Sequence, residues 1–491
     1  MKINSKLKKE KMKPYDIDDE KSVLEYANKL VSKSFYDILA NNLGGKELED
    51  KIKEFSNPKR KGGLGNLLEE YYFGYKPNSS SNPDFKNLGI ELKLTPYEFN
   101  RGFKAGERLV ITMIPNDKEL SIDFETSELK NKIAKMLTIW YLRNKNDKIN
   151  QKINYVYLYD LYNKALSKDL EIIKKDYTKI VQKIIEGKAH ELSEGDTLYL
   201  GACTKGASAS KSLQPQFYNP KIKAKRRAFS LKQSYMSYLL KEYVINSPQK
   251  TIEEICNARD LQNTDFENIV KTKIDFFKGK SIEEIFYILN KPYNSSKQNK
   301  KILINNILNV NVDYCEEINK AGIKIKTITL DKNNNPKEDM SFKNIKFLEF
   351  INTDFYDSYE YELFSKTKFL FVVFKEENNK IKLSHCKFWN MPIKDIENEL
   401  KDEWVMYQEK IKNGVNFIID INKIQNDLPK KSDTLIIHLR PHASKSAYII
   451  NTKKYGNGTN EDMDLLPNGD KMTKQCFWLN KDYLKNILKE W

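Results

Sequence analysis

The chain has 491 residues, enough for two or three domains that each bury a hydrophobic core. A hydrophobic fraction of 40% and an aromatic fraction of 12% favour a folded protein. No apolar run approaches the ~18 residues that a membrane helix needs. The first ten residues, MKINSKLKKE, are charged and lack the apolar region of a secretory signal, so we expect a cytoplasmic protein.

The chain carries a large excess of positive charge, because 84 Lys and Arg residues oppose 68 Asp and Glu residues to give a net charge of +16. Such a surplus favours a polyanionic partner, since phosphates neutralised by Lys and Arg release condensed counterions. A host with AT-biased coding, which enriches Lys, Asn and Ile everywhere, would produce the same surplus. The five cysteines are scattered without a CxxC pair and only four histidines occur, so neither a disulfide framework nor a zinc site is indicated.

The N-terminal region predicts helices that lead to a basic, glycine-rich turn. Apolar residues keep helical spacing from Lys21 to about Asn42. The segment 59–70, KRKGGLGNLLEE, then opens another apolar helix with Lys61 in its first turn. A glycine turn at the start of a helix lets backbone N–H groups approach an anion. Glu69 on this helix either complements the helix dipole or leans toward the acids that follow.

The stretch 82–95, NPDFKNLGIELKLT, carries the candidate catalytic residues. We interpret it as a turn that runs into a strand, where Glu91 and Lys93 project from one face because strand side chains repeat with period two. Asp84 and Glu91 would offer Mg²⁺ the oxygen ligands it prefers. Lys93 beside that ion could hold the attacking water or offset charge that develops on a phosphate. The pattern suits metal-dependent phosphodiester hydrolysis, although an exposed amphipathic strand alternates in the same way.

Predicted strands and helices alternate in the rest of the first half. We expect an apolar strand at 108–114 to pair beside residues 89–94. A helix is predicted for 129–142, a strand for 153–158 and a long amphipathic helix for 170–186.

Two basic segments follow these elements. A loop of small residues at 202–211 contains Lys205, and the segment 221–232 contains Arg227 and Lys232. Lysines and arginines punctuated by small residues suit a loop that follows DNA phosphates. A solvated basic surface would look similar.

The second half repeats the motifs of the first half in the same order. Lys324 then stands where the first half has Glu91, and Glu317 is the only acid near the place of Asp84. A site with a cation in place of a carboxylate cannot hold Mg²⁺, but it can still hold a phosphate. We therefore interpret the second half as a binding copy that has lost the chemistry. The five matching segments are 301–309 with 61–69, 321–328 with 88–95, 368–375 with the strand from Arg108, 435–446 with 198–208, and 477–483 with 229–235.

Together these motifs resemble the MutH family of GATC-directed endonucleases, and the duplicated layout looks closest to the two-domain Sau-type restriction endonucleases. The resemblance implies an α/β fold with two tandem restriction-endonuclease-like domains, each a central mixed β-sheet flanked by helices. We expect a catalytic domain at 1–245, a helical connector at 246–297 and an inactive DNA-binding effector domain at 298–491.

The resemblance also implies roles for individual residues. Asp84 and Glu91 would be Mg²⁺ ligands, Lys93 the catalytic lysine and Glu69 an auxiliary acid, with Lys61 near the DNA or the site. The implied reaction is cleavage of double-stranded DNA at 5′-GATC-3′, which leaves 5′-phosphate ends.

The loop at Lys205 corresponds to the base-reading loop of the family. It lacks the arginine–proline form found in the second copy, where Arg440 and His442 would contact a second target that acts as an effector. We expect Cys203 to be a packing residue and Trp478 a core aromatic.

Two other functions remain open from the sequence. A repair nickase would cut one strand of hemimethylated DNA, and a regulator would bind DNA without cleaving it. For a restriction enzyme we expect a DNA methyltransferase of the same system as the functional partner. We also expect a monomer that bridges two DNA sites.

Overall fold

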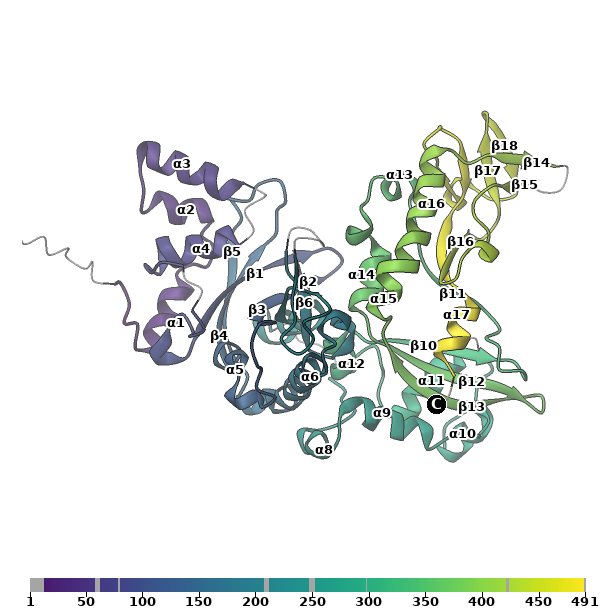
Figure 1. Ribbon diagram of the computed structural model, residues 1–491, viewed down its shortest axis with the longest axis horizontal. Helices are drawn as coiled ribbons and strands as arrows, with labels where there is room; N and C mark the ends of the chain where they lie inside the picture. The colour runs from purple at the N-terminus through teal and green to yellow at the C-terminus, as the bar shows by residue number, and fades with distance from the viewer. Residues whose placement is uncertain are drawn as a thin grey trace, which may run out of the picture.

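The computed structural model describes residues 13–57, 62–77, 80–206, 212–246, 252–296, 298–420 and 424–489. Figure 1 shows two lobes, one from each half of the chain, that meet in the middle of the molecule. Each lobe combines β-sheets with flanking helices, so the predicted α/β class is confirmed. Within these ranges no helix is both long enough and apolar enough to cross a membrane.

The central sheet of the first half has the strand order β2-β1-β4-β5 and mixes parallel with antiparallel pairs. β1 (Glu91–Phe99) runs parallel to β4 (Lys135–Leu142) and antiparallel to β2 (Phe103–Ala105). β4 is antiparallel to β5 (Ile153–Asp160), as predicted for a strand at that position.

Two predictions about this sheet are wrong. The apolar strand expected beside β1, β3 (Leu109–Ile114), lies in a separate sheet of order β3-β9-β6, with β9 (Arg227–Leu231) and β6 (Leu200–Thr204). The segment 129–142 is not one helix, because α5 (Glu128–Ile133) ends and β4 follows at once. A short apolar run of a buried strand has no periodicity that separates it from a buried helix.

Helices cover both faces of the central sheet. Leu137 and Ile139 of β4 pack against the N-terminal helices, whereas Met136 and Trp140 point to the opposite face and share a core with α6 (Ser167–Ile185). The predicted long helix at 170–186 is therefore confirmed as α6. The N-terminal elements are α1 (Glu20–Asn28), α2 (Phe35–Ala40), α3 (Gly45–Ser56), α4 (Gly63–Leu67) and the π-helical turn η1 (Leu68–Tyr72).

The second half repeats this strand pairing. β10 (Lys324–Leu330) runs parallel to β12 (Phe369–Glu377), which is antiparallel to β13 (Lys380–Trp389), just as β1, β4 and β5 are arranged. The order β11-β21-β16 matches β3-β9-β6, with β11 (Met340–Asn344), β21 (Gln475–Leu479) and β16 (Ile437–Pro441). The predicted match of 368–375 with the strand from Arg108 is wrong, since that segment is β12, the counterpart of β4.

The remaining elements of the second half surround these sheets. They are α13 (Phe347–Phe350), α14 (Tyr359–Lys366), α15 (Ile393–Asp395), α16 (Lys401–Asn413), α17 (Lys481–Ile487), β14 (Phe417–Ile419), β15 (Ile424–Asn426), β17 (Ala447–Ile450), β18 (Lys453–Gly456), β19 (Met463–Leu465) and β20 (Lys471–Thr473). In the first half, β7 (Leu213–Gln214), β8 (Ala224–Lys225) and α7 (Gln233–Leu239) complete the structure.

The repeat also includes helices that precede β10. Ser34 caps α2 and Ser281 caps α10 (Ile282–Ile288), and both caps are capping boxes. Each serine forms an isolated antiparallel bridge, Ser34 to Lys152 and Ser281 to Lys382, beside the outer strand of its own sheet. The other helices of this region are α8 (Ala258–Asn263), α9 (Phe266–Asp275), α11 (Asn299–Leu308) and α12 (Glu316–Ala321).

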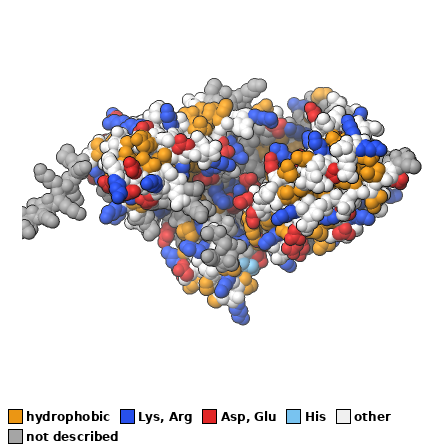
Figure 2. Space-filling model, turned by 90° about the horizontal axis from the view of Figure 1, so that it is seen from above, with side chains coloured by type: hydrophobic (Ala, Val, Ile, Leu, Met, Phe, Trp, Pro, Cys, Tyr) orange, Lys and Arg blue, Asp and Glu red, His pale blue; other side chains and the backbone are white. Residues whose placement is uncertain are grey.

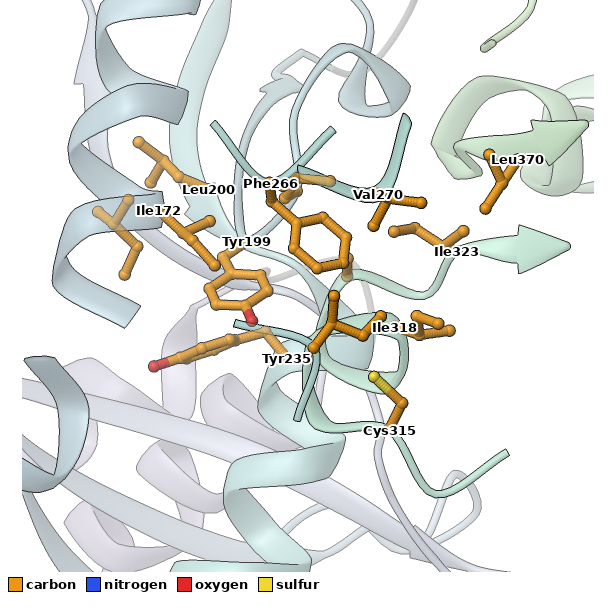
Figure 3. Close-up of a cluster of buried hydrophobic side chains, with 14 of the residues drawn as sticks. Ile172, Tyr199, Leu200, Tyr235, Phe266, Val270, Cys315, Ile318, Ile323 and Leu370 are labelled. Carbon is orange, nitrogen blue, oxygen red and sulfur yellow. The ribbon is translucent and has the colours of Figure 1, made fainter. Parts of the chain in front are cut away.

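One of the hydrophobic cores contains side chains from both halves of the chain. Figure 3 shows side chains from α6, β6 and α7 of the first half packed with side chains from α9, α12 and β12. This continuity means that the halves do not pack as independent globules. The labelled members are Ile172, Tyr199, Leu200, Tyr235, Phe266, Val270, Cys315, Ile318, Ile323 and Leu370.

Candidate active site

The predicted catalytic residues converge at the start of β1. Gly89, with φ +66°, turns the chain so that Phe85 and Ile90 form a bridge, and this turn brings Asp84 back beside the strand. Asp84 Oδ2 accepts the backbone N–H of Leu92 at 2.9 Å. Glu91 is buried at 3% exposure, and its Oε1 accepts from Lys93 Nζ at 2.7 Å.

A second lysine, Lys132, reaches the same carboxylate. It lies in the last turn of α5 and donates to Glu91 Oε1 at 3.2 Å, from 41 residues away in the chain. The sequence held no spacing signal for this contact, because Lys132 fell inside a segment predicted as one helix. Its side chain is only 14% exposed, so solvent screens the attraction between Lys132 and Glu91 less than it would at the surface.

The acids of this cluster are held in an electrostatically unfavourable arrangement. Burial and the Glu91 carboxylate raise the pKa of Asp84 to about 6. Burial and the charge of Asp84 raise the pKa of Glu69, on the π-helical turn η1, to about 7. Glu91 Oε2 is buried with no hydrogen-bond partner among the described residues. Both lysines donate to Oε1 of Glu91, so its Oε2 has no cation or hydrogen-bond donor among the described residues to compensate its charge.

These residues fit a divalent cation such as Mg²⁺. Within the described chain, no three or more Asp, Glu, His or Cys side chains are grouped closely enough to enclose a metal. Mg²⁺, however, is commonly bound by one or two carboxylates and completes its shell with waters and substrate phosphates. Asp84 and the unpartnered Oε2 of Glu91 supply such a pair, and Glu69 lies close enough to share their field.

The predicted DNA contacts of the first half are only partly at the surface. Lys205 is half-buried at the end of β6, and Lys61 lies outside the described residues. Arg227 is 3% exposed and donates to the Ala202 carbonyl at 2.7 Å. Lys232 is buried too deeply to be the surface phosphate contact that we predicted, and Arg227 is not a surface residue either, because it reaches only the wall of the cavity between the two halves.

The position of β9 explains this correction. β9 is the central strand of its sheet, so Arg227 at its start and Lys232 just after its end are buried. Lys221, Lys223 and Arg226, earlier in the same basic segment, remain exposed. The Lys232 ammonium is buried and donates to the Thr197 carbonyl. Burial lowers its pKa to about 7, which a phosphate-binding surface lysine would not show. Cys203 is fully buried, as expected of a packing residue.

A cavity of about 930 Å³ lies between the two halves near Lys205. Arg108, Lys205 and Lys225 line it from the first half, and Asp354 and Glu362 line it from the second. Figure 2 shows the hollow between the lobes bordered by basic and acidic side chains. Glu194 of the first half and Lys366 of the second also line it, so both halves contribute charges of both signs, with more basic groups from the first half.

In the second half, Arg440 and His442 are organised around Trp478. The Arg440 guanidinium lies 4.3 Å from the centre of the Trp478 ring, and the His442 ring makes a T-shaped contact with the same ring, with the ring centres 5.5 Å apart. Arg440 is also 3.6 Å from Asp339 and keeps a side-chain exposure of 52%. Trp478 is half-buried and supports exposed polar groups, so the prediction of a simple core aromatic is wrong.

Comparisons with known proteins agree with this geometry. A family model described as the DNA mismatch repair enzyme MutH matches residues 73–176, the region that contains Asp84, Glu91 and Lys132. The type II restriction enzyme Sau3AI of Staphylococcus aureus is 34% identical over 472 residues, covering 88% of this chain and 93% of that protein. The DNA mismatch repair protein MutH of Vibrio campbellii is 26% identical over 240 residues, covering 48% of this chain and 99% of that protein. The chain therefore belongs to the MutH-like type II restriction endonucleases, a family of DNA-binding nucleases.

Proposed function

We propose that this protein hydrolyses double-stranded DNA at GATC sites with Mg²⁺ and leaves 5′-phosphate ends. The observation that carries the proposal is the pair Asp84 and Glu91, with an unpartnered carboxylate oxygen, beside the ammonium groups of Lys93 and Lys132. The GATC target follows from the family resemblance. A DNA methyltransferase of the same system would protect the host, and we place the activity in the cytoplasm.

Each residue of the cluster has a distinct task in this proposal. Asp84 and Glu91 hold Mg²⁺, which when bound would polarise the scissile phosphate and acidify a water ligand. The Leu92 N–H orients Asp84, so the carboxylate cannot swing away from the site. Lys93 and Lys132 offset charge that develops on the phosphate. Glu69, with its pKa raised to about 7, can take up a proton from water near neutral pH and return it to solvent water.

The second copy would act as an effector domain. Arg440 and His442 would contact a second target, while Lys205 and Lys61 would contact DNA at the catalytic copy. We propose a catalytic domain at 1–245. We also propose that the second domain starts near 265, because the Ser281 cap and bridge repeat those of Ser34, and not at 298 after a long connector. A monomer could then bridge two DNA sites.

Digestion of a plasmid with several GATC sites tests the catalytic proposal. Wild-type protein with Mg²⁺ should give linear fragments with 5′-phosphates at GATC. Asp84→Ala should abolish cleavage and keep DNA binding, whereas the exposed control Asp402→Ala on α16 should cleave like wild type. Nicked circles would indicate a repair nickase. DNA binding without any cleavage by wild type would indicate a regulator.

A one-site fragment tests the effector role. An added GATC oligonucleotide should accelerate its cleavage, provided effector DNA prefers the active arrangement. Arg440→Ala should remove the acceleration and leave basal cleavage in place. Equal rates with and without the oligonucleotide would refute the effector role alone.

A further inference from the structure

The strand that replaces the catalytic strand in the second half carries two lysines at defined positions. Glu91 and Lys93 lie opposite Met136 and Thr138 of the parallel strand β4. Lys324 and Lys326 lie opposite Phe369 and Phe371 of the parallel strand β12, in the same first and third places of the pairing. Because alternate residues share a face, both lysines project where the first half presents its metal-binding face.

Among the described residues no carboxylate lies within ion-pair distance of either lysine, and the nearby Glu362, whose charge favours the protonated form of Lys324, is itself paired with Lys366 at 3.2 Å. Glu317, expected at the place of Asp84, points instead into the contact with the first half, where it accepts from Lys168 at 3.1 Å and from the Ile255 N–H. The second copy therefore has the Lys324 ammonium where the first copy has the Glu91 carboxylate, and it keeps a lysine, Lys326, in the place of Lys93.

The surroundings add positive charge and leave space. Lys324 lies 5.9 Å from the ring centre of Tyr359, and Lys343 lies 5.7 Å from the same ring. Lys326 lines a cavity of about 560 Å³. Asp339 and Glu338 also line this cavity. Asp339 is already bound to Lys431 at 2.5 Å and to the Lys481 N–H.

Burial disfavours the charged form of both lysines. Burial lowers the pKa of Lys326, and burial together with the charge of Lys326 lowers the pKa of Lys324. A bound phosphate would reverse this penalty, because an opposite charge favours the protonated ammonium.

We propose that Lys324 and Lys326 bind a backbone phosphate of a DNA duplex directly, so that DNA binding by the second copy needs no metal ion. The inference rests on the proposed function in that DNA supplies the phosphate. The two copies then differ in their need for a metal ion, because at the catalytic copy the carboxylates of Asp84 and Glu91 repel the DNA phosphate until a cation is bound. The effector site can therefore be filled before the catalytic site has its metal.

Binding of a fluorescent GATC duplex by the full-length protein tests this difference. In EDTA, wild type should bind one duplex per chain, and Ca²⁺, a cation used here to avoid cleavage, should allow a second. Lys324→Gln and Lys326→Gln should each weaken binding in EDTA about tenfold. Each should also lower the slope of log affinity against log salt by about one. The matched control Lys332→Gln, an exposed lysine in the turn after β10, should change affinity less than twofold.

Thermal unfolding of each variant checks that the fold is intact. The inference is overturned if wild type binds no duplex in EDTA, or if folded Lys324→Gln and Lys326→Gln bind like the control. A parallel digestion with Mg²⁺ keeps the two proposals apart. Cleavage by wild type with lysine-independent binding in EDTA would refute only this inference, whereas absence of cleavage would refute the proposed function.

Discussion

Replacement of Lys320 by methionine should loosen the contact between the two halves. Lys320 lies on α12 with a side-chain exposure of 2%, and its Nζ donates to both oxygens of Asp169 on α6 at 2.7 and 2.8 Å. It also donates to Glu316 at 2.6 Å. One ammonium therefore compensates two carboxylates at the junction of the halves.

The expected loss in the free energy of unfolding depends on which partners Asp169 and Glu316 keep when Lys320 is replaced. Asp169 would keep only the Tyr235 hydroxyl, at 2.8 Å, and Glu316 would keep Lys168, at 2.5 Å. Breaking a buried ion pair from one side costs about 3–5 kcal/mol of the free energy of unfolding. Because Glu316 keeps a cation and methionine restores apolar packing, we expect the lower end, about 3 kcal/mol.

The loss should also depend on pH. Burial already raises the pKa of Asp169, and removal of Lys320 raises it further. The folded state then holds a proton that the unfolded chain releases above about pH 4, so stability falls as the pH rises. The destabilisation should be larger at pH 8 than at pH 5.

Urea unfolding followed by tryptophan fluorescence at both pH values measures this effect. The control is Lys346→Met, which removes an exposed pair with Glu349 whose side chains are 70% and 71% exposed. The control should lose no more than about 0.5 kcal/mol. An equal loss in Lys320→Met and Lys346→Met would refute the reasoning.

Three further predictions concern the catalytic cluster. Lys132→Met should slow single-turnover cleavage about a hundredfold at unchanged DNA affinity, because Glu91 loses one of the groups that position it, and an unchanged rate would contradict this. The raised pKa values of Asp84 and Glu69 mean that the metal-free fold binds more protons than the unfolded chain, so its stability falls from about pH 4 to 7. Mg²⁺ should therefore raise the melting temperature more at pH 8 than at pH 6, and equal increases would contradict this. Tyr75→Phe removes a buried hydroxyl that has no hydrogen-bond partner among the described residues. The free energy of unfolding should stay unchanged or rise by up to about 1 kcal/mol, and a clear decrease would contradict this.

The sequence by itself determined the features that depend on neighbouring residues. Asp84, Glu91 and Lys93 were predictable because one turn and the alternation of one strand bring them together within ten residues. The α/β class and the repeated order of motifs were also readable, since each motif is a short local pattern. The replacement of Glu91 by Lys324 followed from the same alignment.

Only the tertiary structure decided which distant segments meet. Lys132 reaches Glu91 because β4 pairs with β1, and that pairing depends on a crossover that no local pattern specifies. Burial could not be predicted from the sequence either. Lys232 belongs to a basic segment, but it directly follows β9, the central strand of its sheet, and is buried. Catalytic residues that lie within one short stretch can be recognised from the sequence. Which strands pair and which side chains are buried depend on how the whole chain packs.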